Sequence, residues 1–477
     1  MILAQTPTLA DFGQDVWWIV LIKILGAFVF GVVMTLLGVW FERRVVAFMQ
    51  TRPGPNQAGP LGLLQTLADG LKMAFKEDII PRGANRFVFL IAPAISVVCA
   101  LTALSVIPFG PMVSMFGHQT PLQVTDVPVA VLVLLAVSAI SVYGVVLGGW
   151  GSGSPYPLLG GLRASAQLIS YEVALGLSFV TVFIMAGTMS TSEIVAAQAN
   201  NPQLTLGGFT FSVPGWYVLL LLPTFVLFAI SIVGETNRAP FDLPESESEL
   251  VAGFMTEYST LRFALFMLAE YVHMVVASSV ITTLFLGGWR APWPITAFWE
   301  GANTGWWPLL WFMGKVVAIL FVFVWLRGTL PRMRYDHFMK LGWKVLIPLG
   351  LVWLVLLAGV RVIQVSDLST GQRVAFGGGL AVVLALVVLL WPQRKQPPRM
   401  SVAEQVAARP PGSFPVPPLD LQVPPSPRAR REVAGKREAS AAEPIDGEVV
   451  GATSAGPESS TETRSDGAGR EGDEGRG

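Results

Sequence analysis

Residues 128–149 read PVAVLVLLAVSAISVYGVVLGG, a run of twenty-two positions without a charged side chain. A bilayer core about 30 Å thick is crossed by about 20 apolar residues of helix, so this run is long enough to span a membrane. The whole chain contains nine segments that are candidate membrane spans by length and hydropathy, and we take eight as the minimum. They are 16–41, 87–107, 128–149, 168–186, 216–234, 263–287, 308–326, 343–360 and 374–391. The sequence therefore predicts an all-α polytopic membrane protein.

The composition limits the classes of partner and cofactor. Of the 477 residues 52% are hydrophobic and only 13% are charged, about half the charged share of a soluble domain. The 32 basic and 32 acidic residues cancel, so no basic excess is present to bind nucleic acid. One cysteine, Cys99, and three separated histidines exclude an internal disulfide and argue against a zinc or iron–sulfur site in this chain. We therefore expect no metal centre and no redox centre here.

The charges are unevenly distributed along the chain. A transmembrane helical domain, 1–391, precedes a tail, 392–477, that is rich in Pro, Gly and charged residues and that we predict to be disordered. If the N-terminus lies outside, the inside loops carry fifteen Lys and Arg residues and the outside loops carry three. The positive-inside rule therefore predicts an external N-terminus, and an odd number of spans places the tail in the cytoplasm.

The first inside loop predicts a helix that does not cross the membrane. Prolines and glycines between 52 and 60 predict a turn, and a helical period begins at Leu61 and continues to Lys76. Polar residues form one stripe of this helix, while leucines and Phe75 form the other. Such an amphipathic helix lies in the membrane interface or against a partner, and the alternative is a surface helix that closes the bundle. The polar stripe consists of Gln65, Asp69, Lys72 and Lys76.

Acidic residues gather in and beside the second and third inside loops. An ionised carboxylate inside a span costs about 2.5–3.5 kcal/mol on insertion scales, so acids at the membrane edge need an explanation. One explanation is inert pairing with Arg163, Arg238, Arg262 or Lys315. The other is a proton relay, in which charged and neutral forms lie close in energy. The relay candidates are Glu172, Glu235, Glu245, Glu247, Glu249, Glu257 and Glu270.

Four motifs carry a family resemblance that runs from about residue 16 to 360. They include GPN at 54–56, SYE at 170–172, ETNRAPFDLPE with ESEL between 235 and 250, and RYD at 334–336. With these motifs the chain resembles the H subunit of bacterial NADH–quinone oxidoreductase, which is equivalent to membrane subunit 1 of mitochondrial complex I. Ser246 departs from the family, which often has glycine there, and the tail after Trp391 has no counterpart in the pattern.

The resemblance implies a subunit of a proton-translocating NADH:quinone oxidoreductase in the bacterial cell membrane. It implies that this chain binds no cofactor of its own, that quinone is the substrate, and that partner subunits carry the FMN and the iron–sulfur clusters. Other membrane-arm subunits and lipid are the further partners. Six of the seven acids, all except Glu257, match the family's acids by position and would then form a relay from the quinone site toward those subunits. The quinone channel would be lined by Arg43, Arg52, Asp69, Lys72 and Arg238.

Three rival interpretations of the sequence remain. A membrane subunit of an energy-converting hydrogenase or of a coenzyme F420 dehydrogenase belongs to the same superfamily. A secondary ion transporter working alone would need a midplane site between broken helices. An inert scaffold would tolerate neutralisation of each acid in turn.

Overall fold

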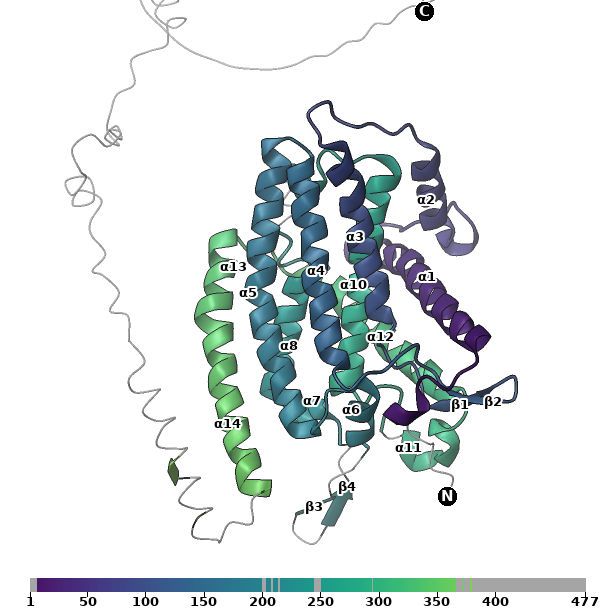
Figure 1. Cartoon of the computed structure of the whole chain (residues 1–477), viewed down its shortest axis with the longest axis vertical. Helices are drawn as coiled ribbons and strands as arrows, with labels where there is room; N and C mark the ends of the chain where they lie inside the picture. Colours follow the sequence, from purple (N-terminus) through teal and green to yellow (C-terminus); the bar gives the residue numbers. More distant parts are fainter. Residues whose placement is uncertain are drawn as a thin grey trace, which may run out of the picture. The chain divides into compact units, whose positions relative to one another are not determined.

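The computed structural model describes residues 7–199, 203–206, 209–212, 215–243, 250–293 and 295–365, together with 372, 378 and 379. This part of the chain is mostly helical (Figure 1). Seven helical stretches in it are long and apolar enough to cross a membrane. Six are α1 (Trp17–Met49), α3 (Arg86–Leu104), α4 (Ala130–Gly151), α5 (Pro155–Ala186), α10 (Thr260–Phe285) and α12 (Trp307–Thr329); the seventh joins α13 (Tyr335–Leu341) to α14 (Ile347–Val365) through a π-helical turn (Gly342–Leu346). The prediction of an all-α polytopic membrane protein is confirmed.

The predicted span at 216–234 is not one continuous helix. It consists of α7 (Tyr217–Leu220) and α8 (Leu222–Glu235), which meet at Leu221 with φ −118° and ψ 43°. Pro223 lies in the first turn of α8, where proline fits because its missing N–H is not needed for the helical ladder. α8 is thus an eighth apolar helix, shorter than the others. The predicted span at 374–391, apart from 378 and 379, and the predicted tail lie outside the described residues.

Two helices extend well beyond their predicted apolar segments. α1 continues to Met49 instead of ending at 41, and α5 begins at Pro155 instead of 168. The added turns contain glutamate, arginine and glutamine, which form helices as readily as leucine does but lower the hydropathy of a window. The loop predicted between the third and fourth spans is therefore mostly the first half of α5.

The remaining elements are short and lie near the ends of the long helices. The helix predicted over 61–76 forms as α2 (Gln65–Phe75). Two antiparallel hairpins are present, and the turn of the first has positive φ at Phe116 and Gly117, as a tight two-residue turn requires. The other short elements are β1 (Met112–Met115), β2 (His118–Pro121), α6 (Thr191–Ala197), β3 (Gln203–Leu206), β4 (Phe209–Ser212) and α11 (Ile295–Phe298).

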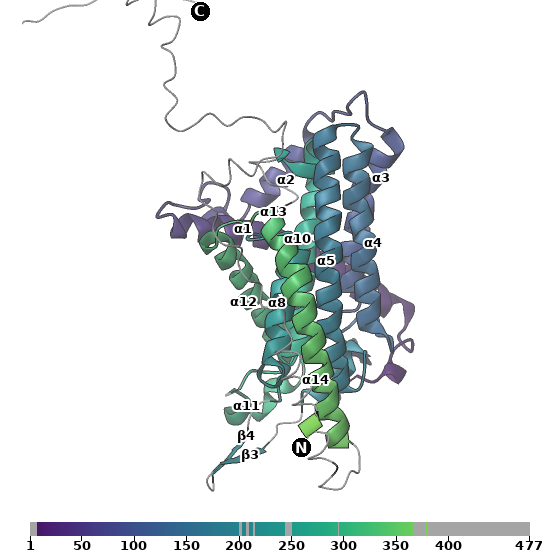
Figure 2. The same cartoon turned by 90° about the vertical axis from the view of Figure 1, so that its left-hand side faces the viewer.

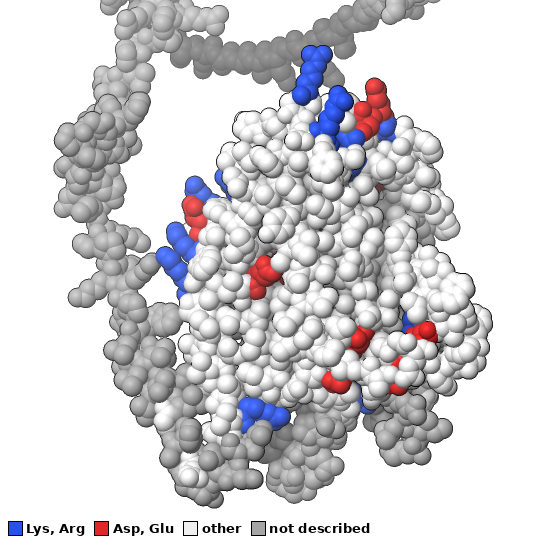
Figure 3. All heavy atoms as spheres, viewed as in Figure 1, with Lys and Arg blue, Asp and Glu red and all other residues white. Residues whose placement is uncertain are grey.

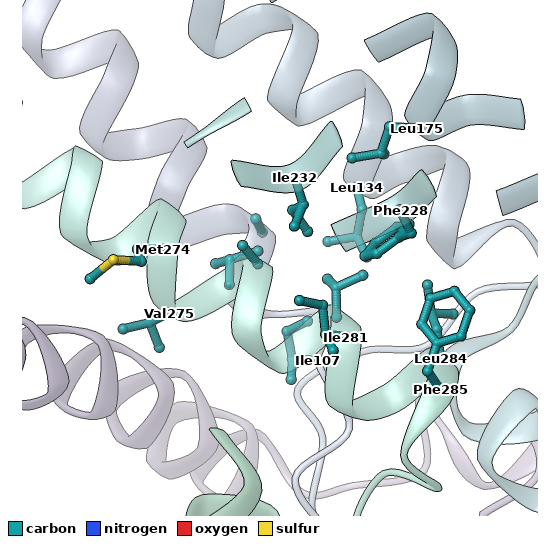
Figure 4. Packing of buried hydrophobic residues seen from close by; sticks show 14 of the residues in the cluster. Ile107, Leu134, Leu175, Phe228, Ile232, Met274, Val275, Ile281, Leu284 and Phe285 are labelled. Atoms are coloured by element: carbon teal, nitrogen blue, oxygen red, sulfur yellow. The ribbon is translucent and has the colours of Figure 1, made fainter. Parts of the chain in front are cut away.

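The hydrophobic core surrounds α10. This helix packs against α3, α12 and α1, and nearly all of its second half is buried. Figure 4 shows Ile281 and Phe285 beside residues of α4, α5 and α8, whereas Met274 and Val275 point away from these residues. Those labelled are Ile107, Leu134, Leu175, Phe228, Ile232, Met274, Val275, Ile281, Leu284 and Phe285. Because α10 contacts so many neighbours, polar groups on it are placed by several helices at once.

Close approach of α3 and α4 depends on a glycine. A Cβ at Gly144 would lie 2.1 Å from Ser96 Oγ and 2.9 Å from the Ala92 carbonyl oxygen. No side chain larger than hydrogen fits there unless the two helices move apart.

Charged side chains are rare across the middle of the molecule. α4, α5 and α14 run alongside one another in Figures 1 and 2, while α1 and α12 lean away from their common direction. On the face drawn in Figure 3, the area over α4 and α5 is almost free of charge, and Lys and Arg gather at its upper end and along the edge next to α13. An uncharged band between charged ends is what a bilayer requires.

Candidate functional site

A largely buried cluster of charges joins four parts of the chain. Glu42, near the end of α1, accepts hydrogen bonds from Arg327 of α12 and from the Tyr271 hydroxyl of α10, the latter at 2.9 Å. Arg238 follows α8 and places Nη1 3.5 Å from Glu42 Oε2. Its Nε lies 3.0 Å from Glu270 Oε1 on α10. Among the described residues, two arginines and two glutamates thus balance one another's charge, as burial of charge demands.

Arg238 is the centre of this cluster. Its side chain is 7% exposed, and its guanidinium carbon lies 4.2 Å from the centroid of the Tyr271 ring, within cation–π range. The planar guanidinium presents donors on more than one side, so one side chain contacts both Glu42 and Glu270. A change of charge at either carboxylate therefore alters the electrostatic interaction between Arg238 and the other carboxylate.

Local structure after α8 fixes the position of Arg238. α8 ends at Glu235, and Asn237 adopts a positive φ of 52°, which turns the chain. Gln167 of α5 is fully buried and donates to the Gly234 carbonyl at 2.7 Å and the Phe241 carbonyl at 3.0 Å. One amide side chain thus binds both ends of the segment that carries Arg238.

A polar cavity of about 480 Å³, the vestibule, lies beside the charge cluster. It is formed by the end of α1, the turn that follows it, and α12. Arg43 also binds Asp69 of α2, with Nη1 2.7 Å from Oδ2. The residues lining the vestibule are Glu42, Arg43, Val46, Ala47, Arg52, Pro53, Gly54, Pro55 and Arg327.

An apolar cavity of about 190 Å³ is formed by the same two helices together with α10. On α1 its lining covers 34–41, directly before the vestibule residues, and on α12 it covers 317–324, directly before Arg327. Its lining residues are Met34, Leu37, Gly38, Trp40, Phe41, Met274, Val317, Leu320 and Val324. An apolar space therefore precedes a polar one along α1 and along α12.

Two further cavities, of about 60 and 50 Å³, form the acid cavities on the other side of α10. Both are lined by Ser138, Glu235, Thr236 and His273, and the larger also by Glu270 and Ser141. Ser138 of α4 donates a hydrogen bond to Glu235. Because Glu270 contacts Arg238 and also lines the larger acid cavity, the charge cluster borders both the vestibule and this cavity.

The structure brings together some of the predicted channel residues. Arg43 and Arg52 line the vestibule, Asp69 binds Arg43, and Arg238 lies at the centre of the charge cluster. Lys72 is exposed on α2 and does not line the vestibule.

The predicted acids are spread over a wider region. Glu235 and Glu270 line the larger acid cavity. Glu172 is half-buried on α5, and Glu257 is half-buried just before α10; neither lines the cavities described above. Glu245, Glu247 and Glu249 lie outside the described residues. Among the described residues, no three His, Cys, Asp or Glu side chains form a group that could bind a metal ion.

Sequence reasoning overlooked Glu42, although it contacts Arg238, Arg327 and Tyr271. In the sequence it directly precedes Arg43 and Arg44, so it reads as part of an exposed charged end of α1. The signal in the sequence was helical spacing, because Thr35 and Glu42 are two turns apart and therefore share a face of α1. In the structure both are buried, so this is the inner face of the helix.

Comparison with known proteins shows the family of the chain. The sequence profile of the NADH dehydrogenase family matches residues 22–358. The H subunit of NADH-quinone oxidoreductase from Streptomyces avermitilis is 52% identical over 439 residues, which cover 89% of this chain and 94% of that protein. The chain belongs to the H-subunit family of NADH-quinone oxidoreductase. It is therefore a multi-pass membrane subunit of complex I, and the resemblance seen in its loop motifs is confirmed.

Proposed function

We propose that this subunit forms the quinone channel of the complex and couples quinone reduction to proton translocation. The observation that carries the proposal is the contact of Arg238 with both Glu42 and Glu270. Glu42 lines the vestibule and Glu270 lines the larger acid cavity, so one arginine connects a space for the substrate to a space for protons.

The order of the cavities suits a quinone. The apolar tail of a quinone favours the apolar cavity, which α1 and α12 form with α10, because burial of hydrocarbon is favourable and nonspecific. The polar head group favours the vestibule, where Arg43, Arg52 and Arg327 supply hydrogen-bond donors. Positive groups there stabilise the negative charge that develops on the head group as electrons arrive. The iron–sulfur clusters and the FMN belong to partner subunits in this proposal.

Coupling follows from the charge balance of the cluster. Two protons must be supplied to a reduced quinone, and a change of charge in the vestibule alters the attraction between Arg238 and Glu42. When that attraction weakens, Arg238 interacts more strongly with Glu270, because both pairs lie in a region of low dielectric constant. The response of Glu270 and Glu235 to this change starts proton movement toward the other membrane-arm subunits.

The distribution of basic residues supports an orientation for this function. The end of the molecule that carries the vestibule also carries most Lys and Arg of the loops, fifteen against three, and faces the cytoplasm in our proposal. The hydrophilic partner subunits then contact the vestibule from the cytoplasm, and lipid surrounds the apolar band.

A passive quinone channel is the second candidate, and one ion pair favours it. Glu270 pairs with Arg238, as expected if the acids are inert. Glu235, in contrast, accepts a hydrogen bond from the neutral hydroxyl of Ser138 and lines both acid cavities. A scaffold has no need for an acid in that position.

Replacement of Arg238 by glutamine tests the proposal in the assembled complex in membrane vesicles. We expect quinone reduction by NADH and proton uptake each to fall at least about tenfold, the equivalent of 1.4 kcal/mol. Reduction of ferricyanide by NADH needs no quinone and reports the amount of flavin-containing complex, so it stays unchanged. Arg82→Gln, at an exposed loop position, is the matched control. Quinone reduction and proton uptake at the wild-type rate in Arg238→Gln would refute the coupling role.

A further inference from the structure

Two serines on one face of α4 connect groups on two other helices. Ser138 and Ser141 are three residues apart, so they are neighbours on the helix surface. Ser138 donates to Glu235 at the end of α8. Ser141 Oγ lies 2.9 Å from Nε2 of His273 on α10. The serine pair therefore links a carboxylate on one side to an imidazole on the other.

The acid cavities connect the same groups. Both cavities are lined by Ser138, Glu235 and His273, and the larger one also by Ser141 and Glu270. One water molecule needs a cavity volume of about 10–15 Å³ and several polar groups with which to form hydrogen bonds. With about 60 and 50 Å³, each cavity has room for more than one water molecule beside these groups.

His273 occupies the middle of the path between the two carboxylates. It is three residues from Glu270 on α10, so both side chains project from the same face of the helix. Beyond it lie Ser141 and then, one turn along α4, Ser138 with Glu235. Every group in this order can take part in hydrogen bonds, and imidazole and hydroxyl can both accept and donate a proton.

We infer that His273 transfers protons between Glu270 and Glu235 through the serine pair and the acid cavities. The inference rests on the proposed function and names the residue that completes its proton path. The neutral imidazole accepts a proton at one ring nitrogen and releases one at the other. The Ser141 hydroxyl accepts that proton and passes its own onward, so His273 and Ser141 return to their neutral forms. One proton leaves the Glu270 side and one arrives at Glu235.

A structural role for His273 is the competing explanation, because a buried hydrogen bond to Ser141 would stabilise the packing of α4 against α10. Glutamine separates the two explanations. Its side-chain amide reaches about as far as Nε2 and keeps a donor for Ser141, but it does not exchange a proton between two sites as imidazole does. A structural role therefore predicts that His273→Gln resembles the wild type, and a transfer role predicts that it does not.

The experiment uses the whole complex in sealed vesicles and compares His273→Gln with Ser141→Ala and Ser141→Thr. We expect His273→Gln and Ser141→Ala to lower quinone reduction and proton uptake at least about tenfold, since positioned proton transfer contributes a hundredfold or more. Threonine retains the hydroxyl and should restore activity. The control is Ser279→Ala, on the same helix as His273, whose hydroxyl donates to the Val275 carbonyl at 2.8 Å and lines neither acid cavity.

The outcomes separate this inference from the proposed function. Wild-type turnover and a wild-type number of protons per electron in His273→Gln overturn the inference. They leave the proposed function standing if Arg238→Gln still loses activity. If Arg238→Gln keeps full activity, the proposed function fails whatever His273 does. If His273→Gln does not assemble on native electrophoresis, Ser141→Ala against Ser141→Thr decides: equal activity in the two overturns the inference.

Discussion

Replacement of Glu42 by glutamine removes the carboxylate that both Arg238 and Arg327 contact. Arg238 keeps its contact with Glu270, but the guanidinium group of Arg327 loses the carboxylate that it contacts. The side chains of Glu42 and Arg238 are 9% and 7% exposed, so water compensates little. Breaking a buried ion pair from one side costs about 3–5 kcal/mol. Because Arg327 is 44% exposed and can turn toward water, we expect the lower end, about 3 kcal/mol.

A second substitution restores the charge balance and supplies the control. In Glu42→Gln with Arg327→Met, Arg238 and Glu270 remain as one neutral pair. The double variant should therefore be more stable than Glu42→Gln alone, with a coupling free energy of about 1–3 kcal/mol between the two sites. Glu77→Gln, at an exposed loop position, should change stability by no more than about 0.5 kcal/mol.

The stability is measured on the detergent-solubilised complex, independently of its activity. Samples are held at a fixed raised temperature, and native electrophoresis follows the fraction of full-size complex with time. If about half of the expected loss appears in the barrier to unfolding, Glu42→Gln shortens the half-time about tenfold. Arg327→Met alone is measured in the same way. If the effects of Glu42→Gln and Arg327→Met simply add in the double variant, the reasoning is contradicted, because Glu42 and Arg327 then do not share a cluster.

Two further predictions concern glycines. Gly38 lines the apolar cavity, and a Cβ at this position would lie 3.7 Å from the Tyr271 ring. Gly38→Leu should fill the cavity and raise KM at least about threefold for a long-tailed quinone, but less for a short-tailed one. Equal changes in KM for both quinones would speak against a channel there. Gly144→Ala places Cβ 2.1 Å from Ser96 Oγ and should cost about 1–3 kcal/mol, seen as less full-size complex on native electrophoresis. Gly176→Ala, with nothing within 4 Å, should match the wild type, and equal loss in both variants would show that crowding is not the cause.

Hydropathy predicts the apolar part of each span because burial in lipid selects apolar side chains on every face. It does not predict where the helix itself ends. α5 begins at Pro155, in sequence that hydropathy excludes, because helix formation depends on backbone hydrogen bonds as much as on burial and because proline fits the first helical turn. In the sequence, only Pro223 indicates the break at Leu221. Proline is common in the first turn of a helix and also in loops, so it does not by itself predict where the helix begins.

The site was also predictable only in part. The sequence predicts that acids and arginines of the inside loops pair near the membrane, because an unpaired charge there is costly. Which charges meet was not predictable, since Glu42 and Arg238 are separated by 196 residues and come together only through packing of α1, α10 and the turn after α8. Placement of Glu42 in the interior and of Lys72 at the surface depends on helix rotation, which sequence alone defines poorly.

One helix, α10, contributes Tyr271 to the charge cluster, His273 to the acid cavities and Met274 to the apolar cavity, all within a single turn. A rigid helix transmits a small rotation to every side chain it bears. An inhibitor bound beside Met274 would thus disturb proton transfer without contacting any acid. A substitution there that confers resistance to the inhibitor would also lower the number of protons translocated per electron. In the function that we propose, inhibitor binding in the apolar cavity and proton transfer through the acid cavities both depend on α10.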